Sequence, residues 1–210
     1  MTDNWPALAA DYPDLAHIPP ALRHAARVRV FAAGETVFRQ GDRPKAMFRV
    51  LEGEVRLLRR SRDGAETVLQ RSRGGYFAEA SLDASAYHCD AVVAVESRLL
   101  SFPKAVFREA LNGAPAFRDA WMAQLAREVR MLRARCERLS LHGAEARILH
   151  ALESEGTEGT LTLAQSRKAW AADLGLTHEA LYRALARLQA AGTLALDGAR
   201  LTLLRPGERL

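Results

Sequence analysis

Polar side chains that can bind the edges of nucleic-acid bases fall on one face of a predicted helix near the C-terminus. The helix is expected over residues 177–190. Its apolar positions form one stripe that would pack inward: Leu181, Ala184, Leu185 and Leu188. The opposite face carries His178, Glu179, Tyr182 and Arg183. An arginine can donate two hydrogen bonds to guanine, and a glutamate can accept one from cytosine. This face is therefore a candidate for reading double-stranded DNA in the major groove.

An alternative interpretation of these charges is a simple ion pair on the helix surface. Glu179 and Arg183 are four residues apart, and such a pair stabilises a helix by only a few tenths of a kcal/mol. The neighbouring residues favour DNA binding instead. Gly175 permits a sharp turn, and the Thr177 hydroxyl can cap the following helix. A preceding helix, expected over 164–174, offers side chains for contacts to phosphate: Ser166, Arg167 and Lys168.

Residues 142–210 have the pattern of a small helical domain that ends in a hairpin. A first helix is expected over 144–154, ahead of the two helices described above. Residues 193–196 and 199–203 have the composition of strands, and Asp197-Gly198 between them favours a tight turn. Three helices closed by a hairpin predict a winged helix-turn-helix.

Charge alone does not establish this function. The formal net charge of +5 and the pI of about 9.7 favour polyanionic partners. However, residues 141–210 hold eight Lys and Arg against eight Asp and Glu, so the basic excess lies upstream of the predicted DNA-binding domain. The order of the elements, rather than the composition, therefore indicates DNA binding.

Cysteine content and hydropathy limit the classes of protein to which this chain can belong. Cys89 and Cys136 are far apart in the sequence, which predicts neither a disulfide framework nor a metal site. No apolar run approaches the roughly 20 residues needed to span a bilayer, and the first residues lack the pattern of a secretion signal. We therefore expect a cytoplasmic protein without a membrane partner.

A long helix expected over residues 116–141 carries an apolar heptad seam. Its members are spaced alternately by three and four residues: Met122, Leu125, Val129, Leu132, Cys136 and Leu139. This spacing predicts a parallel coiled coil, and hence a homodimer, in which Glu128 and Arg133 can pair between chains. The alternative is a helix buried within its own domain. Because the seam spans only about two and a half heptads, a coiled coil would need support from the flanking domains.

Residues 1–115 form the first predicted domain. Short strands are expected at 28–31, 47–51, 54–58 and 91–95. They are separated by turn residues: Gly34, Gly41-Asp42, Gly53, Asp63-Gly64 and Gly74-Gly75. This pattern is typical of a small antiparallel barrel or roll. Ahead of it, residues 6–26 predict short helices broken by Pro13 and Pro19-Pro20.

The succession of these parts resembles the CRP/FNR family of bacterial transcription regulators. The resemblance covers nearly everything after about residue 25. It is carried in the first domain by Phe31-Ala32-Ala33-Gly34-Glu35, Gln40-Gly41-Asp42, Leu51-Glu52-Gly53-Glu54-Val55 and Asp63-Gly64-Ala65-Glu66, and in the last by Leu174-Gly175-Leu176-Thr177-His178-Glu179 through Arg183 to Leu188 and Gly192. The resemblance implies an α+β fold with a cyclic-nucleotide-binding-like β-roll (a jelly roll), a dimerisation helix and a winged helix-turn-helix. It also implies RNA polymerase as a partner.

The same resemblance assigns roles within the predicted recognition helix. Glu179 and Arg183 match the family's base-reading residues. His178 stands where cyclic-AMP-responsive members carry an Arg that also reads DNA, and Tyr182 replaces a small residue. We therefore expect a pseudo-palindromic operator whose half-sites differ from the best-known ones.

The predicted sensor departs from the cyclic-AMP-binding pattern. Those members carry a Gly-Glu pair followed by an Arg that clamps the cyclic phosphate. Here Ala78 precedes Glu79, and Tyr87-His88-Cys89-Asp90 stands where the Arg would be. Without this cation a buried phosphate loses its charge-assisted partner, so cyclic AMP is not the expected effector. The candidate effector pocket is Glu79, Ser81, His88, Cys89, Leu132 and Arg133.

The same residues bear on two other cofactors, an iron-sulfur cluster and haem. An iron-sulfur cluster would need N-terminal cysteines, and the first cysteine is Cys89. A haem would need an axial ligand, for which His88 and Cys89 are candidates, although side chains that simply fill a strand are the preferred interpretation. The effector is thus left unidentified.

Two alternative functions would not involve DNA. A cupin-like enzyme would need clustered metal ligands, and of the histidines only His88 lies within the roll. A cyclic-nucleotide-binding module that regulates a partner protein would not need a winged helix-turn-helix. We therefore expect a regulator, not an enzyme.

Overall fold

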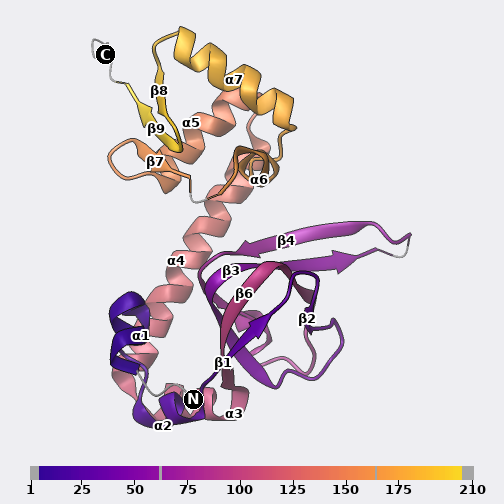
Figure 1. Cartoon of the computed structure of the whole chain (residues 1–210), viewed down its shortest axis with the longest axis vertical. Helices are drawn as coiled ribbons and strands as arrows, with labels where there is room; N and C mark the ends of the chain where they lie inside the picture. Colours follow the sequence, from indigo (N-terminus) through magenta and orange to yellow (C-terminus); the bar gives the residue numbers. More distant parts are fainter. Residues whose placement is uncertain (1–4, 62, 164, 205–210) are drawn as a thin grey trace. The chain divides into compact units, whose positions relative to one another are not determined.

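The computed structural model describes residues 5–61, 63–163 and 165–204 (Figure 1). The chain packs as two units, residues 1–122 and residues 123–210. The long helix α4 (Pro115–Ser140) begins in the first unit and continues into the second. No helix in the described ranges has the length and apolarity needed to cross a membrane.

The first unit opens with the short helices that the prolines predict. They are α1 (Trp5–Asp11), the 3-10 helix η1 (Pro13–Leu15) and α2 (Pro20–Ala25). A partly buried ion pair anchors this segment to the roll, because Arg49 donates two hydrogen bonds to the Asp14 carboxylate, at 2.6 and 2.7 Å. The Arg49 guanidinium also lies over the Tyr12 ring, 4.4 Å from its centroid.

An antiparallel sheet rolled around an aromatic core forms the rest of the first unit, which confirms the predicted roll. Its strands are β1 (Arg27–Phe31), β2 (Thr36–Phe38), β3 (Ala46–Arg60), β4 (Glu66–Ser72), β5 (Gly75–Phe77) and β6 (Asp90–Pro103). The strand order is β1-β6-β3-β4, with β2 paired to β6 and β5 paired to β3. Stacked rings fill the interior, among them Phe38, Phe48, Phe77 and Tyr87.

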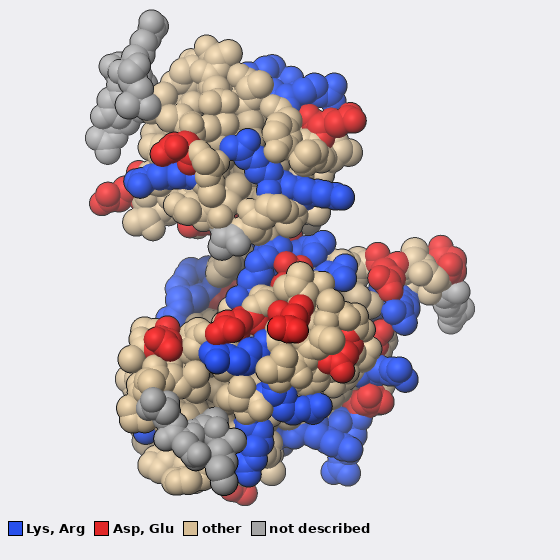
Figure 2. All heavy atoms as spheres, viewed as in Figure 1, with Lys and Arg blue, Asp and Glu red and all other residues tan. Residues whose placement is uncertain are grey.

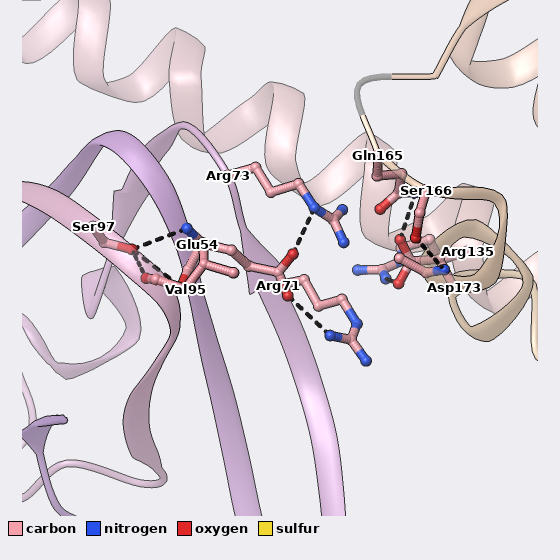
Figure 3. Close-up of polar contacts among 10 residues, drawn as sticks. Glu54, Arg71, Arg73, Val95, Ser97, Arg135, Gln165, Ser166 and Asp173 are labelled. Carbon is pink, nitrogen blue, oxygen red and sulfur yellow. Dashed lines mark hydrogen bonds and ion pairs between the residues drawn. The ribbon is translucent and has the colours of Figure 1, made fainter. Parts of the chain in front are cut away.

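One turn prediction in this domain is wrong. Gly53 was expected to separate two strands, but it lies inside the continuous strand β3, with a φ of +91°. A side chain at this position would collide with Ser97 on β6, so the glycine permits a close approach of two strands rather than a turn. The Ser97 hydroxyl accepts from the Glu54 backbone N–H at 3.0 Å, and the Glu54 carboxylate binds Arg71 and Arg73 (Figure 3).

A second aromatic cluster joins the roll to the start of α4. The ring of Trp121 meets Tyr76 edge-on at 5.0 Å between centroids, and it meets Phe107 at 4.9 Å. Phe107 belongs to α3 (Lys104–Gly113) and also contacts Phe102 and Phe117. These contacts bury Phe117 and Trp121, one face of the first two turns of α4, against the roll.

The second unit has the predicted order of three helices and a hairpin, with one additional strand. After α4 come α5 (Ala144–Glu155), β7 (Thr160–Thr162), α6 (Arg167–Asp173), α7 (His178–Ala190), β8 (Leu194–Asp197) and β9 (Arg200–Leu203). The sheet order is β7-β9-β8, and Gly198 makes the turn between β8 and β9. The helix expected from 164 begins later, because Ser166 caps it; Ala164 lies outside the described residues.

Candidate DNA-binding surface

The helix α7 has the two faces that its sequence predicts. The apolar stripe is buried in the core of the second unit: Leu181, Ala184, Leu185 and Leu188. Thr177 is the N-cap, and its hydroxyl accepts from the Ala180 backbone N–H at 3.1 Å. Gly175 has a φ of +65°, which the turn between α6 and α7 requires. The predicted turn, cap and stripe are therefore confirmed.

The opposite face of α7 is exposed at all four predicted positions: His178, Glu179, Tyr182 and Arg183. The His178 ring meets the Tyr182 ring edge-on, with 4.5 Å between centroids. In the described part of the chain, Glu179 and Arg183 form no ion pair with each other or with any other residue. Both side chains are therefore available to an external partner, and the surface-pair alternative is not supported.

Arg167 at the start of α6 contacts both the wing and the recognition helix. Its guanidinium donates to the carbonyl of Gly198, at 2.9 Å, and lies 5.6 Å from the centroid of the Tyr182 ring. Ser166 caps α6 by accepting from the Ala169 backbone N–H at 3.3 Å, and Lys168 is exposed. Of the residues expected to contact phosphate, Lys168 is thus the exposed cation, whereas Arg167 also positions the hairpin turn.

The predicted dimer seam lies on the open side of α4. Met122, Val129, Leu132 and Leu139 are exposed, Met122 to 60% and Leu139 to 58%. Cys136 is exposed as well, and Leu125 is half-buried. A helix buried within its own domain would hide these side chains, so this alternative is wrong for the single chain. Apolar residues repeated along one exposed stripe are the pattern that the predicted coiled-coil seam would present in a single chain.

The residues expected to form the effector pocket have different environments. Ser81 and Cys89 are buried in the roll, whereas His88 is exposed. Glu79 lies in the 3-10 helix η2 (Glu79–Ser81). Leu132 and Arg133 lie on α4 in the second unit, and both are exposed. Burial raises the pKa of the Cys89 thiol to about 11, so at neutral pH it is protonated and a poor redox centre or thiolate ligand.

Ala78 adopts a backbone conformation that favours glycine. Its φ is +74° and its ψ is 9°, the left-handed region that costs an L-residue roughly 1 kcal/mol. A glycine would adopt this conformation without that cost, so the backbone shape at position 78 suits the residue that the family pattern has there. The methyl group of Ala78 is buried among the aromatic residues of the roll.

One functional candidate was missed by the sequence analysis. Arg147 on α5 donates to four backbone carbonyls at once: Leu139 at 3.3 Å, Leu141 at 3.1 Å, Leu174 at 3.2 Å and Gly175 at 3.1 Å. It thus joins the end of α4 to the turn ahead of the recognition helix. A lone arginine on a helix gives no signal of this role, because all its acceptors are main-chain atoms.

Further ion pairs tie the last turns of α4 to the same unit. Arg138 is almost fully buried and binds Glu155 and Ser154 at the end of α5. Arg135 lies 3.8 Å from the carboxylate of Asp173, which also accepts from Gln165 at 3.0 Å (Figure 3). The second half of α4 is therefore joined by side-chain contacts to α5 and α6, in the same unit as α7.

Comparisons with known proteins agree with this architecture. The family model described as the cyclic nucleotide-binding domain matches residues 28–113. The cyclic AMP receptor protein of Thermus thermophilus is 30% identical over 171 residues, which cover 80% of this chain and 79% of that protein. The nitrogen fixation regulation protein FixK of Bradyrhizobium diazoefficiens is 28% identical over 196 residues, covering 89% and 82%. A solved CRP-family transcriptional regulator from Thermus thermophilus is 26% identical, with a TM-score of 0.53 and coverage of 84% and 92%.

A β-roll, a long helix and a winged helix-turn-helix together define a class of DNA-binding transcription regulator. The chain belongs to the CRP/FNR family of bacterial transcription regulators. The relatives named above are regulators rather than enzymes. In the described ranges, no group of three or more His, Cys, Asp or Glu side chains is arranged to hold a metal ion.

We predict that Arg147→Ala loosens the turn between α6 and α7. Four hydrogen bonds to carbonyls are lost, and we expect the free energy of local opening over residues 167–190 to fall by about 2 kcal/mol. Amide hydrogen exchange of the purified protein measures this change. The matched control is Arg187→Ala, which breaks a solvent-exposed pair with Glu145 and should change exchange little. Equal protection in the two variants would contradict the role assigned to Arg147.

Proposed function

We propose that the protein is a homodimer that reads a pseudo-palindromic operator by placing α7 of each chain in the major groove. The observation that carries this proposal is the exposed, unpaired state of Glu179 and Arg183 on a helix whose other face is buried. Both residues lie in the first two turns, the part of a recognition helix that contacts base edges. Arg183 would donate to guanine, and Glu179 would accept from cytosine.

His178 and Tyr182 set the expected sequence preference. Their rings pack edge to face, so the face that would meet the groove is partly aromatic. An aromatic surface is better suited than a second cationic side chain to contact the methyl group of thymine. Thr177, Ser166 and Lys168 would contact phosphates, and these contacts would fix the register of the helix on the duplex.

The homodimer is supported by the exposed seam of α4. Two parallel helices would bury Leu132 and its neighbours along the seam, and Glu128 of one chain would face Arg133 of the other. Because the first turns of α4 are buried on the roll and its last turns are tied to α5 and α6, the flanking domains can supply the support that the short seam needs. RNA polymerase is the partner expected by family.

We further propose that the effector is not cyclic AMP. Residues 78–90 contain no Lys or Arg, so this segment offers a cyclic phosphate no cation. Tyr87 does not replace one, since its ring stacks on Phe38 at 3.7 Å and its hydroxyl is bound to Ala46 and Lys45. Cys89 and Ala78 belong to the same buried apolar core, and an apolar environment favours an effector without a buried charge, or none at all. Haem remains a lesser alternative, with His88 as its candidate ligand.

We expect Arg183→Ala to abolish specific DNA binding. Loss of a bidentate contact to guanine costs roughly 1–3 kcal/mol per half-site, and a dimer loses it twice. Operators selected from random duplexes with the native protein provide the probe for a gel-shift titration. The control is Arg187→Ala, one turn further along α7 and paired with Glu145. Undiminished discrimination between operator and random DNA by Arg183→Ala would refute the assignment.

We expect Leu132→Glu to convert the dimer to a monomer. The change places two carboxylates opposite each other in an apolar seam, where their burial and mutual repulsion are costly. Light scattering coupled to size exclusion measures the mass. Met131→Glu is the matched control, because Met131 is exposed to 58% but lies off the seam. A dimeric mass for Leu132→Glu, or a monomeric mass for both variants, would argue against the predicted register.

We expect cyclic AMP at about 1 mM to leave the melting temperature unchanged. A ligand with a Kd of roughly 10 μM would stabilise the protein by about 2.7 kcal/mol at that concentration, which raises a melting temperature by several degrees. Thermal unfolding with and without the nucleotide tests this. An increase of that size would show that the roll binds cyclic AMP despite the missing arginine.

A further inference from the structure

A basic pocket in the first unit has no part in the function proposed above. It lies between the loop after β2, the segment after η2 and the beginning of α3, and its volume is about 920 Å³. Four of its eight lining residues are cations, and none is acidic: Arg43, Lys45, Lys104 and Arg108. In the view of Figure 2, basic side chains gather at the lower end of this unit, where α3 lies in Figure 1.

Hydrogen bonds hold the Lys104 ammonium in place and anchor the backbone of Lys45. The Lys104 ammonium donates to the carbonyls of Ser81 at 3.0 Å and Ala84 at 2.9 Å, which leaves one of its three N–H groups for a ligand. The Lys104 backbone N–H donates to the Lys45 carbonyl at 2.8 Å. The Lys45 backbone N–H in turn donates to the Tyr87 hydroxyl, at 3.3 Å. These bonds connect the beginning of α3 to the loop after β2, and they connect that loop to Tyr87 of the roll.

The charge inside the pocket is poorly compensated. Asp83 lies 3.4 Å from Arg108, but its side chain is 82% exposed, so solvent screens this pair. Arg43 forms no ion pair with any residue that the structure describes. The positive end of the α3 dipole adds to the field. Four like charges around one concavity repel each other, and an anion bound among them relieves that repulsion.

We propose that this pocket binds a small polyanion, a metabolite that carries at least two phosphate charges. Its volume falls within the range of roughly 300–1,000 Å³ typical of small-molecule sites. Two arginines can each bind a phosphate bidentately, while the lysines act as point charges. The alternative occupant is an acidic segment of another protein. A pocket with a fixed ammonium group in its wall is better suited to a compact ligand than to an extended protein segment.

The test uses inorganic pyrophosphate as the probe in a calorimetric titration of the full chain. We expect saturable binding at one site per chain. The double variant Arg43→Ala/Arg108→Ala should weaken it by about 100-fold, if each charge-assisted contact contributes roughly a factor of ten. Arg118→Ala, which removes a half-exposed arginine of the same unit outside the pocket, should bind as the native protein does. Arg183→Ala should also bind normally, which excludes the DNA-reading face.

Three results would overturn the proposal. One is the absence of saturable heat up to about 10 mM pyrophosphate, an affinity too weak to be specific. A second is equal binding by the double variant and by Arg118→Ala, which would place the anion elsewhere. The third is saturable binding of poly-glutamate in the absence of pyrophosphate binding, which would identify the pocket as a docking surface for an acidic protein.

Discussion

The packing of Trp121 against Tyr76 and Phe107 is the contact on which the rest of the molecule depends. It fixes the start of α4 on the roll through several edge-to-face ring contacts, each of which stabilises the fold beyond simple burial. Beyond this end, the side chains of the predicted seam are mostly exposed, among them Met122, Val129, Leu132 and Leu139. At its other end Arg138 and Arg147 bind α4 to the DNA-reading unit, so α4 is a structural part of both units.

The sequence predicts those elements whose signals are local. The stripe of α7, the Thr177 cap and the turn at Gly175 depend on residues within a few positions of one another, and each occurs as expected. Gly53 shows the limit of such reasoning. A glycine between two apolar runs has the same sequence signature whether it makes a turn or permits a neighbouring strand to approach, and only the contact with Ser97 on β6 distinguishes them.

The candidate functional residues likewise include some that the sequence predicts and others that it does not. The exposed face of α7 follows from periodicity, because the buried stripe determines which side chains point outward. The contacts of Arg147 and the cationic pocket depend on segments far apart in the chain, and no spacing in the sequence indicates them. For Ala78 the sequence shows only part of the feature. It shows that this residue precedes Glu79, but it does not show that the backbone of Ala78 is left-handed.

The two contacts of Arg167 have a consequence for how the binding specificity can diverge. One guanidinium touches both the turn of the wing at Gly198 and the ring of Tyr182, so changes in the wing and in the recognition helix are energetically coupled. A substitution at Tyr182 that suits a new base sequence also removes a support of the hairpin. Over evolutionary time, residues 167 and 182 are therefore expected to change together among relatives that acquire new operators.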